Sequence, residues 1–205
     1  ENKVNSLLGL SRLIDGFSER WGKGVYWLIL LAVLISAINA IVRKTFNTSS
    51  NAFLEIQWYL FSAVFLLNAG YTLLHKEHVR IDVISGRLSK TKQIWIDIIG
   101  LIFFLLPFCI LTISLSWPLF VKVFVTNEMS SNAGGLVRWP VYALIPVGFG
   151  LLLIQGISEL IKRFAFLKGL IEDPTLKKTE KTAEEELAEA ILKAAENKTN
   201  QEKRK

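Results

Sequence analysis

Long apolar runs, separated by short polar or charged segments, extend over most of the chain from residue 25 to residue 168. Four of these runs are long enough to cross about 30 Å of hydrocarbon as helices that rise about 1.5 Å per residue. We predict transmembrane helices over about residues 25–42, 53–74, 94–121 and 141–161. The apolar residues form continuous runs and not the one-sided stripes of a soluble helical core. The pattern therefore predicts an all-α, multi-pass membrane protein.

Two segments flank this four-helix transmembrane domain, which we assign to residues 25–168. Residues 1–24 place apolar side chains such as Leu7 and Phe17 at roughly helical spacing among charged residues. This spacing predicts a short amphipathic helix in the membrane interface. From residue 169 onward the composition changes to Lys, Glu, Ala and Thr. We expect residues 169–205 to form a charged tail, either helical or disordered.

Lysine and arginine are distributed unevenly between the two sides of the predicted helices. Twenty of them precede the first helix, connect the second to the third or follow the fourth, whereas four lie in the other two connections. The excess marks the cytoplasmic side, so we predict that both termini and the loop with His78 are cytoplasmic and that Glu55 and residues 128–140 lie outside. All six tryptophans lie near predicted helix ends, where indole rings anchor at the interface: Trp21, Trp27, Trp58, Trp95, Trp117 and Trp139.

The second predicted helix carries several polar or small residues. Asn51 is a candidate N-cap, which would place Glu55 in the first turn, where the helix dipole favours a carboxylate. Ser62 and Gly70 belong to a face of low relief, and the amide of Asn68 needs a hydrogen-bonding partner. This face either packs against other helices of the same chain or docks another membrane protein.

The connection after this helix is strongly charged. His75 and His78 are three residues apart, with Glu77 and Asp82 nearby, and these residue types can bind metal. Histidines in an interfacial loop are more often hydrogen-bonded structural groups, and we predict no metal site. Arg80 and Asp82 form an ion pair or bind headgroups, or one of them reaches a neighbouring subunit.

Composition and candidate chemistry narrow the function classes. The net charge of +6 would suit nucleic acid, but the basic residues flank the apolar runs, so we predict membrane lipids as partners and no nucleic acid. The single cysteine, Cys109, lies in an apolar run, which excludes an internal disulfide. We see no nucleophile with a nearby base, no phosphate-binding loop and no inverted repeat. We therefore predict neither an enzyme, nor a cofactor, nor a complete carrier.

Two stretches of the sequence resemble one known family. The first is Glu55, followed by a Trp- and Tyr-rich helix and the H-x-R-x-D run of residues 78–82. The second covers residues 128–163 and begins with EMSSNAGGLVRWP. Together they resemble the small (Q-type, DctQ-like) membrane subunit of tripartite ATP-independent periplasmic (TRAP) transporters, over about residues 20–168. The second stretch is similar to the branch associated with mannitol or chloroaromatic compounds, where 2-oxo acids and related carboxylates are the better supported substrates.

The resemblance implies a function for the chain in a bacterial inner membrane. It would be a static belt against a large multi-span transport subunit, in a complex that uses a sodium gradient to take up small organic acids from a periplasmic binding protein. By this analogy the structural or interface residues are Glu55, His78, Arg80 and Asp82. The candidate contacts for the binding protein are Glu128, Ser130, Ser131, Asn132 and Arg138. Substrate and sodium sites would belong to the large subunit.

Two alternatives remain open. The chain could be an independent membrane anchor or assembly protein that acts through its charged tail, in which case deletion of residues 175–205 would abolish function. A small channel is a weaker alternative, because residues 100–115 contain only Thr112 and Ser114 as polar side chains.

Overall fold

The computed structural model describes residues 2–47, 50–75 and 88–171 of the chain. Over these residues the chain is all-helical apart from its turns and one isolated antiparallel bridge between Met129 and Val137. The helices are α1 (Asn2–Phe46), α2 (Asn51–Leu67), α3 (Ala69–His75), α5 (Lys90–Gly100), a π-helical turn (Leu101–Leu105), α6 (Leu106–Val125) and α7 (Trp139–Leu167).

Four helical stretches of this structure are long and apolar enough to cross a membrane. They are Ser6–Phe46, Asn51–His75, Lys90–Val125 and Trp139–Leu167. Each contains one of the four predicted spans, so the prediction of an all-α protein with four membrane helices is confirmed. The side of the membrane on which the termini lie stays a prediction.

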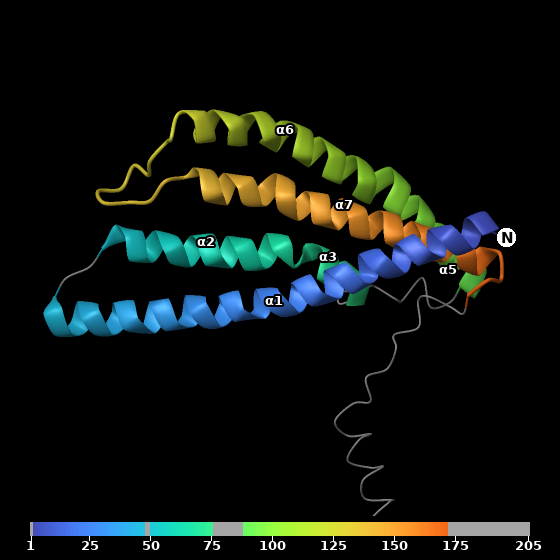
Figure 1. Cartoon of the computed structure of the whole chain (residues 1–205), viewed down its shortest axis with the longest axis horizontal. Helices are drawn as coiled ribbons and strands as arrows, with labels where there is room; N and C mark the ends of the chain where they lie inside the picture. Colours follow the sequence, from blue (N-terminus) through green and yellow to red (C-terminus); the bar gives the residue numbers. More distant parts are fainter. Residues whose placement is uncertain (1, 48–49, 76–87, 172–205) are drawn as a thin grey trace, which may run out of the picture. The chain divides into compact units, whose positions relative to one another are not determined.

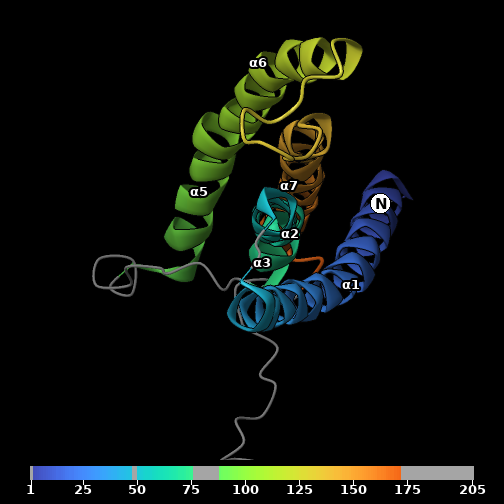
Figure 2. The same cartoon turned by 90° about the vertical axis from the view of Figure 1, so that its left-hand side faces the viewer.

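Helix α7 is the element against which the others pack. It contacts α1, α2, α3, α5 and α6, and Figures 1 and 2 show it lying between α2 and α6. Glycines allow these close approaches: a Cβ at Gly148 of α7 would lie 2.7 Å from the carbonyl oxygen of Leu66 in α2. Gly70 of α3 similarly faces the backbone of Leu151, where an added Cβ would lie 3.3 Å from the carbonyl oxygen. Small residues therefore bring the backbones of α2 and α3 against α7.

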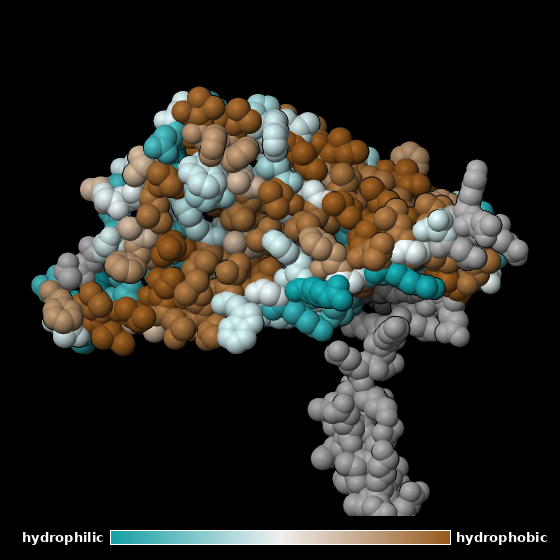
Figure 3. All heavy atoms as spheres, in the orientation of Figure 1, coloured by the Kyte–Doolittle hydropathy of each residue, from teal (hydrophilic) through white to brown (hydrophobic). Residues whose placement is uncertain are grey.

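Large apolar side chains cover the outside of the described helices (Figure 3). Phe65 and Phe104, for example, expose 78% and 74% of their surface. Such exposure would be a liability in water, but lipid tails are as apolar as these side chains. The few fully buried side chains include Ile94, Ile98 and Cys109, together with a set of polar groups. The surface is thus that of a protein solvated by hydrocarbon.

The structure differs from the sequence-based expectation in the boundaries of two helices. Residues 1–24 were predicted to form a separate short helix, but from Asn2 they belong to the 45-residue helix α1. Their place in the membrane interface stays a prediction. Ser50, not Asn51, is the N-cap of α2, and Glu55 therefore lies just beyond the first turn. The Asn51 side chain instead donates a hydrogen bond to the carbonyl of Ala133, 2.9 Å away.

Two interruptions of regular helix also distinguish the structure from the expectation. A break at Asn68 separates α2 from α3, and a π-helical turn over Leu101–Leu105 precedes Pro107. Proline cannot donate to the carbonyl four residues earlier, and a wider turn relieves the resulting clash. The sequence indicated a kink or tilt near Pro107 but did not indicate a π-helical turn.

Replacement of Gly148 by alanine tests the close packing of α2 on α7. The added Cβ would overlap the Leu66 backbone, so we expect Gly148→Ala to lower the free energy of unfolding by about 1–3 kcal/mol. Cys109 is buried and is the single cysteine of the chain, so thermal unfolding of the purified protein can be followed with a thiol-reactive dye.

Gly150→Ala is the matched control on the same helix. No atom lies within 4 Å of a Cβ built at Gly150, so this change should be neutral or slightly stabilising, by up to about 1 kcal/mol. Equal effects of the two substitutions would contradict the packing argument.

Candidate functional site

The carboxylate of Glu55 holds the loop that connects α6 to α7. Its Oε1 accepts hydrogen bonds from the hydroxyl of Ser130 and from Nδ2 of Asn132, the latter at 2.8 Å. Its Oε2 accepts a hydrogen bond from the backbone N–H of Leu136 at 2.7 Å. Glu55 is itself buried, and charge-assisted hydrogen bonds are stronger than neutral ones. One side chain of α2 thus fixes three points of a loop about 80 residues later in the sequence.

Further contacts close the same loop on itself and on α2. The hydroxyl of Tyr59 donates to the carbonyl of Val137 at 2.9 Å, and Ser130 N–H donates to the carbonyl of Leu136 at 2.9 Å. Gly134 has a φ of 70°, in the left-handed region that glycine adopts without strain, and supplies the turn at the tip. We call residues 126–138 the outer loop.

A charged pair lies at the base of the outer loop. Nη1 of Arg138 donates to Oε1 of Glu128 at 2.7 Å. This hydrogen bond raises the pKa of the Arg138 guanidinium above its ordinary value, so the guanidinium stays charged over the physiological range. Both side chains are partly exposed, which makes the pair a weak contributor to stability and a locally neutral surface.

The five predicted contacts for a binding protein therefore divide into two kinds. Glu128 and Arg138 pair with each other, and Ser130 and Asn132 bind Glu55. Ser131 lies at the exposed tip, together with residues 132–134. The sequence did not show that four of these residues position the loop. Their contact with a partner stays a prediction.

A cavity of about 630 Å³ opens beside the outer loop, between α2 and α7. Its lining is polar at one end, where Glu55, Ser131 and Arg138 lie, and apolar at the other, where Leu66 and Ile145 lie. Two further predicted residues, Ser62 and Trp58, belong to the lining.

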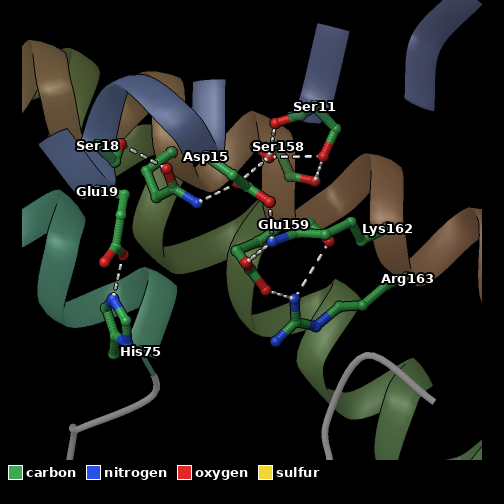
Figure 4. Close-up of polar contacts among 10 residues, drawn as sticks. Ser11, Asp15, Ser18, Glu19, His75, Ser158, Glu159, Lys162 and Arg163 are labelled. Carbon is green, nitrogen blue, oxygen red and sulfur yellow. Dashed lines mark hydrogen bonds and ion pairs between the residues drawn. The ribbon is translucent and has the colours of Figure 1, made fainter. Parts of the chain in front are cut away.

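A second polar cluster joins the N-terminal part of α1 to α7 (Figure 4). Oδ1 of Asp15 accepts hydrogen bonds from Ser158 at 2.7 Å and from Gln155 at 2.9 Å, and Oδ2 accepts one from Lys162 at 3.0 Å. The hydroxyls of Ser11 and Ser158 are 2.7 Å apart. Ser11, Gln155 and Ser158 are fully buried, so the hydrogen bonds within this cluster replace those that their side chains would make to water.

Arg163 extends this cluster to α5. Its Nη1 contacts Oε2 of Glu159 at 2.5 Å, and its Nε contacts Oδ2 of Asp97 at 3.2 Å. Glu159 also pairs with Lys162. The predicted local pairing of Glu159 with Lys162 and Arg163 is confirmed, whereas the roles of Asp15 and Asp97 were not foreseen from the sequence. We call Asp15, Gln155, Ser158, Glu159, Lys162, Arg163 and Asp97 the inner network.

His75 lies at the same end of the molecule. Its Nε2 is 2.6 Å from Oε2 of Glu19, which also pairs with Lys23 at 2.8 Å, and its ring lies 4.2 Å from that of Tyr71. These contacts match the structural alternative for this histidine. Within residues 2–47, 50–75 and 88–171, no group of three or more His, Cys, Asp or Glu side chains is placed to hold a metal ion. The predicted residues His78, Arg80 and Asp82 lie outside the described residues.

The remaining predicted residues occupy defined places. Gly70 packs on α7 of the same chain, and Asn68 caps α2 with its Oδ1 buried and lacking a hydrogen bond to the described residues. Among the tryptophans, five are exposed and one packs edge-on against Phe124: Trp21, Trp27, Trp58, Trp95 and Trp117 are exposed, and Trp139 packs. Their role as interfacial anchors stays a prediction.

Loss of the Glu55 charge tests whether this residue holds the outer loop. In Glu55→Gln an amide replaces one carboxylate oxygen and presents N–H groups to donors, so we expect hydrogen exchange over residues 128–137 to accelerate about tenfold. Mass spectrometry of the exchanged peptides measures this directly. Glu19→Gln, which changes a carboxylate at the other end of the molecule, should leave these peptides unaffected. Unaltered exchange in Glu55→Gln would show that other contacts suffice.

Removal of the Arg163 guanidinium tests the inner network. Arg163→Gln leaves Asp97 and the fully buried Glu159 without this partner, and Lys162 alone still contacts Glu159. We expect the free energy of unfolding to fall by about 3 kcal/mol, as for other broken buried pairs. The same dye-based melt measures the change. Lys168→Gln, at an exposed position just after α7, is the control, and a similar shift in both variants would contradict the assignment.

Comparison with protein families identifies the chain. Residues 25–166 match the family described as "Tripartite ATP-independent periplasmic transporters, DctQ component". No curated protein and no solved structure is significantly similar to the chain. The match covers the four membrane spans predicted from the sequence, the outer loop and most of the inner network. The predicted resemblance is confirmed, and the chain belongs to the DctQ component family of tripartite ATP-independent periplasmic transporters.

Proposed function

We propose that this multi-pass membrane protein is the small scaffold subunit of its transporter. It packs against the large transport subunit and helps to dock a periplasmic binding protein, so that the complex takes up small organic acids with a sodium gradient. The observation that carries this proposal is the outer loop, which Glu55 fixes in one conformation while its tip at residues 131–134 stays exposed.

The two polar clusters suit a subunit that does not move during transport. Glu55 fixes the outer loop to α2, and the inner network joins α1, α5 and α7 through charged side chains, of which Glu159 and Arg163 are buried. Separating either set of contacts would leave the buried Glu55, or the buried Glu159 and Arg163, without the partners that replace water, which is costly. This supports the proposal of a rigid scaffold against which the large transport subunit moves.

The charge distribution supports the orientation that docking requires. Twenty lysine and arginine residues lie on one side and four on the other, which by the positive-inside rule supports cytoplasmic termini and an outer loop on the periplasmic side of the inner membrane. The neutral Glu128–Arg138 pair leaves the loop surface without a strong local charge. We therefore propose that the loop contacts the binding protein through its shape and hydrogen bonds.

The substrate class is proposed from the family resemblance of residues 128–163, and sodium as the coupling ion from the resemblance to the transporter family as a whole. That stretch is similar to the branch that takes up 2-oxo acids and related carboxylates. Substrate and sodium sites would lie in the large subunit.

Gentle extraction of the C-terminally tagged chain from native membranes tests the scaffold role. We expect a large multi-span protein to copurify in stoichiometric amount, identified by mass spectrometry, and to remain after deletion of residues 175–205. Recovery of the chain alone would overturn the proposal. Loss of function on tail deletion, with the complex intact, would favour the independent anchor instead.

Docking has its own readout in the same complex. Ser131→Trp adds a bulky side chain at the exposed tip without touching the Glu55 contacts, so it should weaken association of the binding protein about tenfold and leave the large subunit bound. Ser114→Trp, on the exposed side of α6, is the control. Equal affinity in both variants would show that docking does not use the loop.

A further inference from the structure

The cavity beside the outer loop has the polarity of a lipid molecule. One end is lined by a carboxylate, a guanidinium and hydroxyl groups from Glu55, Arg138 and Ser131. From there it follows α2 to Leu66, a rise of about 16 Å for eleven residues at about 1.5 Å each. This is close to the depth of one leaflet, since a bilayer core is about 30 Å thick. Its volume of about 630 Å³ opens between two helices whose outer surfaces are apolar.

The charges at the polar end define the headgroup. Arg138 uses Nη1 to bind Glu128, and the other guanidinium N–H groups can donate to a phosphate, because its side chain is 38% exposed. Glu55 accepts three hydrogen bonds from the outer loop, and a carboxylate has about four acceptor positions. One acceptor position therefore remains for a donor in the cavity. Among the described residues that line the cavity, Glu55 is negative and Arg138 is positive, whereas Glu128, which pairs with Arg138, does not line it. These two charges match a headgroup that carries both an ammonium and a phosphate.

The apolar end suits an acyl chain. Ser62, Leu66 and Ile145 line it with small or aliphatic surface, and Trp58 and Tyr142 lie between this end and the charges. Indole and phenol side chains are typical of the level at which headgroups meet hydrocarbon. The order of lining residues along the cavity is therefore that of a phospholipid from headgroup to tail.

We propose that this cavity binds one zwitterionic phospholipid with a primary ammonium, its phosphate on Arg138, its ammonium at Glu55 and one acyl chain along α2 toward Leu66. The lipid fills the space between α2 and α7 and contacts the outer loop through the same carboxylate that fixes the loop. The conformation of the outer loop would then depend on whether the lipid is bound. This binding site is independent of whether the outer loop docks a binding protein.

Lipid retention by the full-length chain, purified with its native subunits, tests the proposal. The complex is equilibrated with vesicles of equal parts phosphatidylethanolamine, phosphatidylglycerol and phosphatidylcholine, washed in mild detergent and assayed for bound lipid by mass spectrometry. We expect selective, stoichiometric retention of phosphatidylethanolamine. Arg138→Gln should lower that retention about tenfold through loss of a charge-assisted contact, and Ser62→Phe should abolish it by filling the acyl end.

Matched variants separate lipid binding from loop disruption. Glu128→Gln breaks the same pair but leaves the guanidinium in place, and should retain the lipid. Ser114→Phe adds the same ring on α6, away from the cavity, and should also retain it.

Three outcomes would overturn the proposal. The first is equal retention of the three lipids by the unmodified complex. The second is unchanged retention in both Arg138→Gln and Ser62→Phe. The third is a complex that contains no bound lipid and in which a side chain of a neighbouring subunit crosslinks to residues of the cavity. That result would show that the neighbouring subunit fills the cavity.

Discussion

Hydrocarbon offers no hydrogen-bonding partner, and this constraint decides where the polar side chains of the protein lie. Each buried charge that the structure describes in the membrane helices has a partner of opposite charge or a hydrogen-bond donor: Glu55 binds the outer loop, Glu159 pairs with Lys162 and Arg163, and Arg163 also pairs with Asp97. The two clusters occupy opposite ends of the helices, and the described residues between them include no buried charge. The protein is therefore fixed at both ends by directional contacts and in between by close packing.

Helix α7 takes part both in the close packing between helices and in the polar contacts at one end of the molecule. Its Gly148 allows the close approach of α2 at one level, while its Gln155, Ser158, Lys162 and Arg163 bind side chains of α1 and α5 at another. Helix α6 packs on its other flank and exposes much of its apolar surface. A helix that contacts all of its neighbours has little freedom to move, which fits the static scaffold role proposed above.

Sequence reasoning predicted the features that depend on local pattern. The four membrane helices follow from the length of their apolar runs, and the pairs of Glu159 with Lys162 and Arg163 follow from helical spacing. Contacts between distant segments have no such signal, because a serine or aspartate in an apolar helix does not reveal its partner. Asp15 thus could not be matched to Ser158, 143 residues later, or Glu55 to the outer loop. The π-helical turn depends on how the chain relaxes around Pro107, which spacing alone does not determine.

Helix α1 is uninterrupted, so its contacts near the two ends of the molecule are held in a fixed orientation relative to each other. Its 45 residues extend about 68 Å at about 1.5 Å each, more than twice the thickness of the hydrocarbon, so the helix must tilt or project beyond it. The same rod carries Asp15 to the inner network and continues along α2. One residue inserted between these contacts would turn one against the other by about 100°, with no loop to absorb the rotation. The number of residues in α1 between these contacts therefore fixes the rotation of one end of the helix relative to the other. An insertion or deletion there would disturb the contacts even if every remaining residue were unchanged.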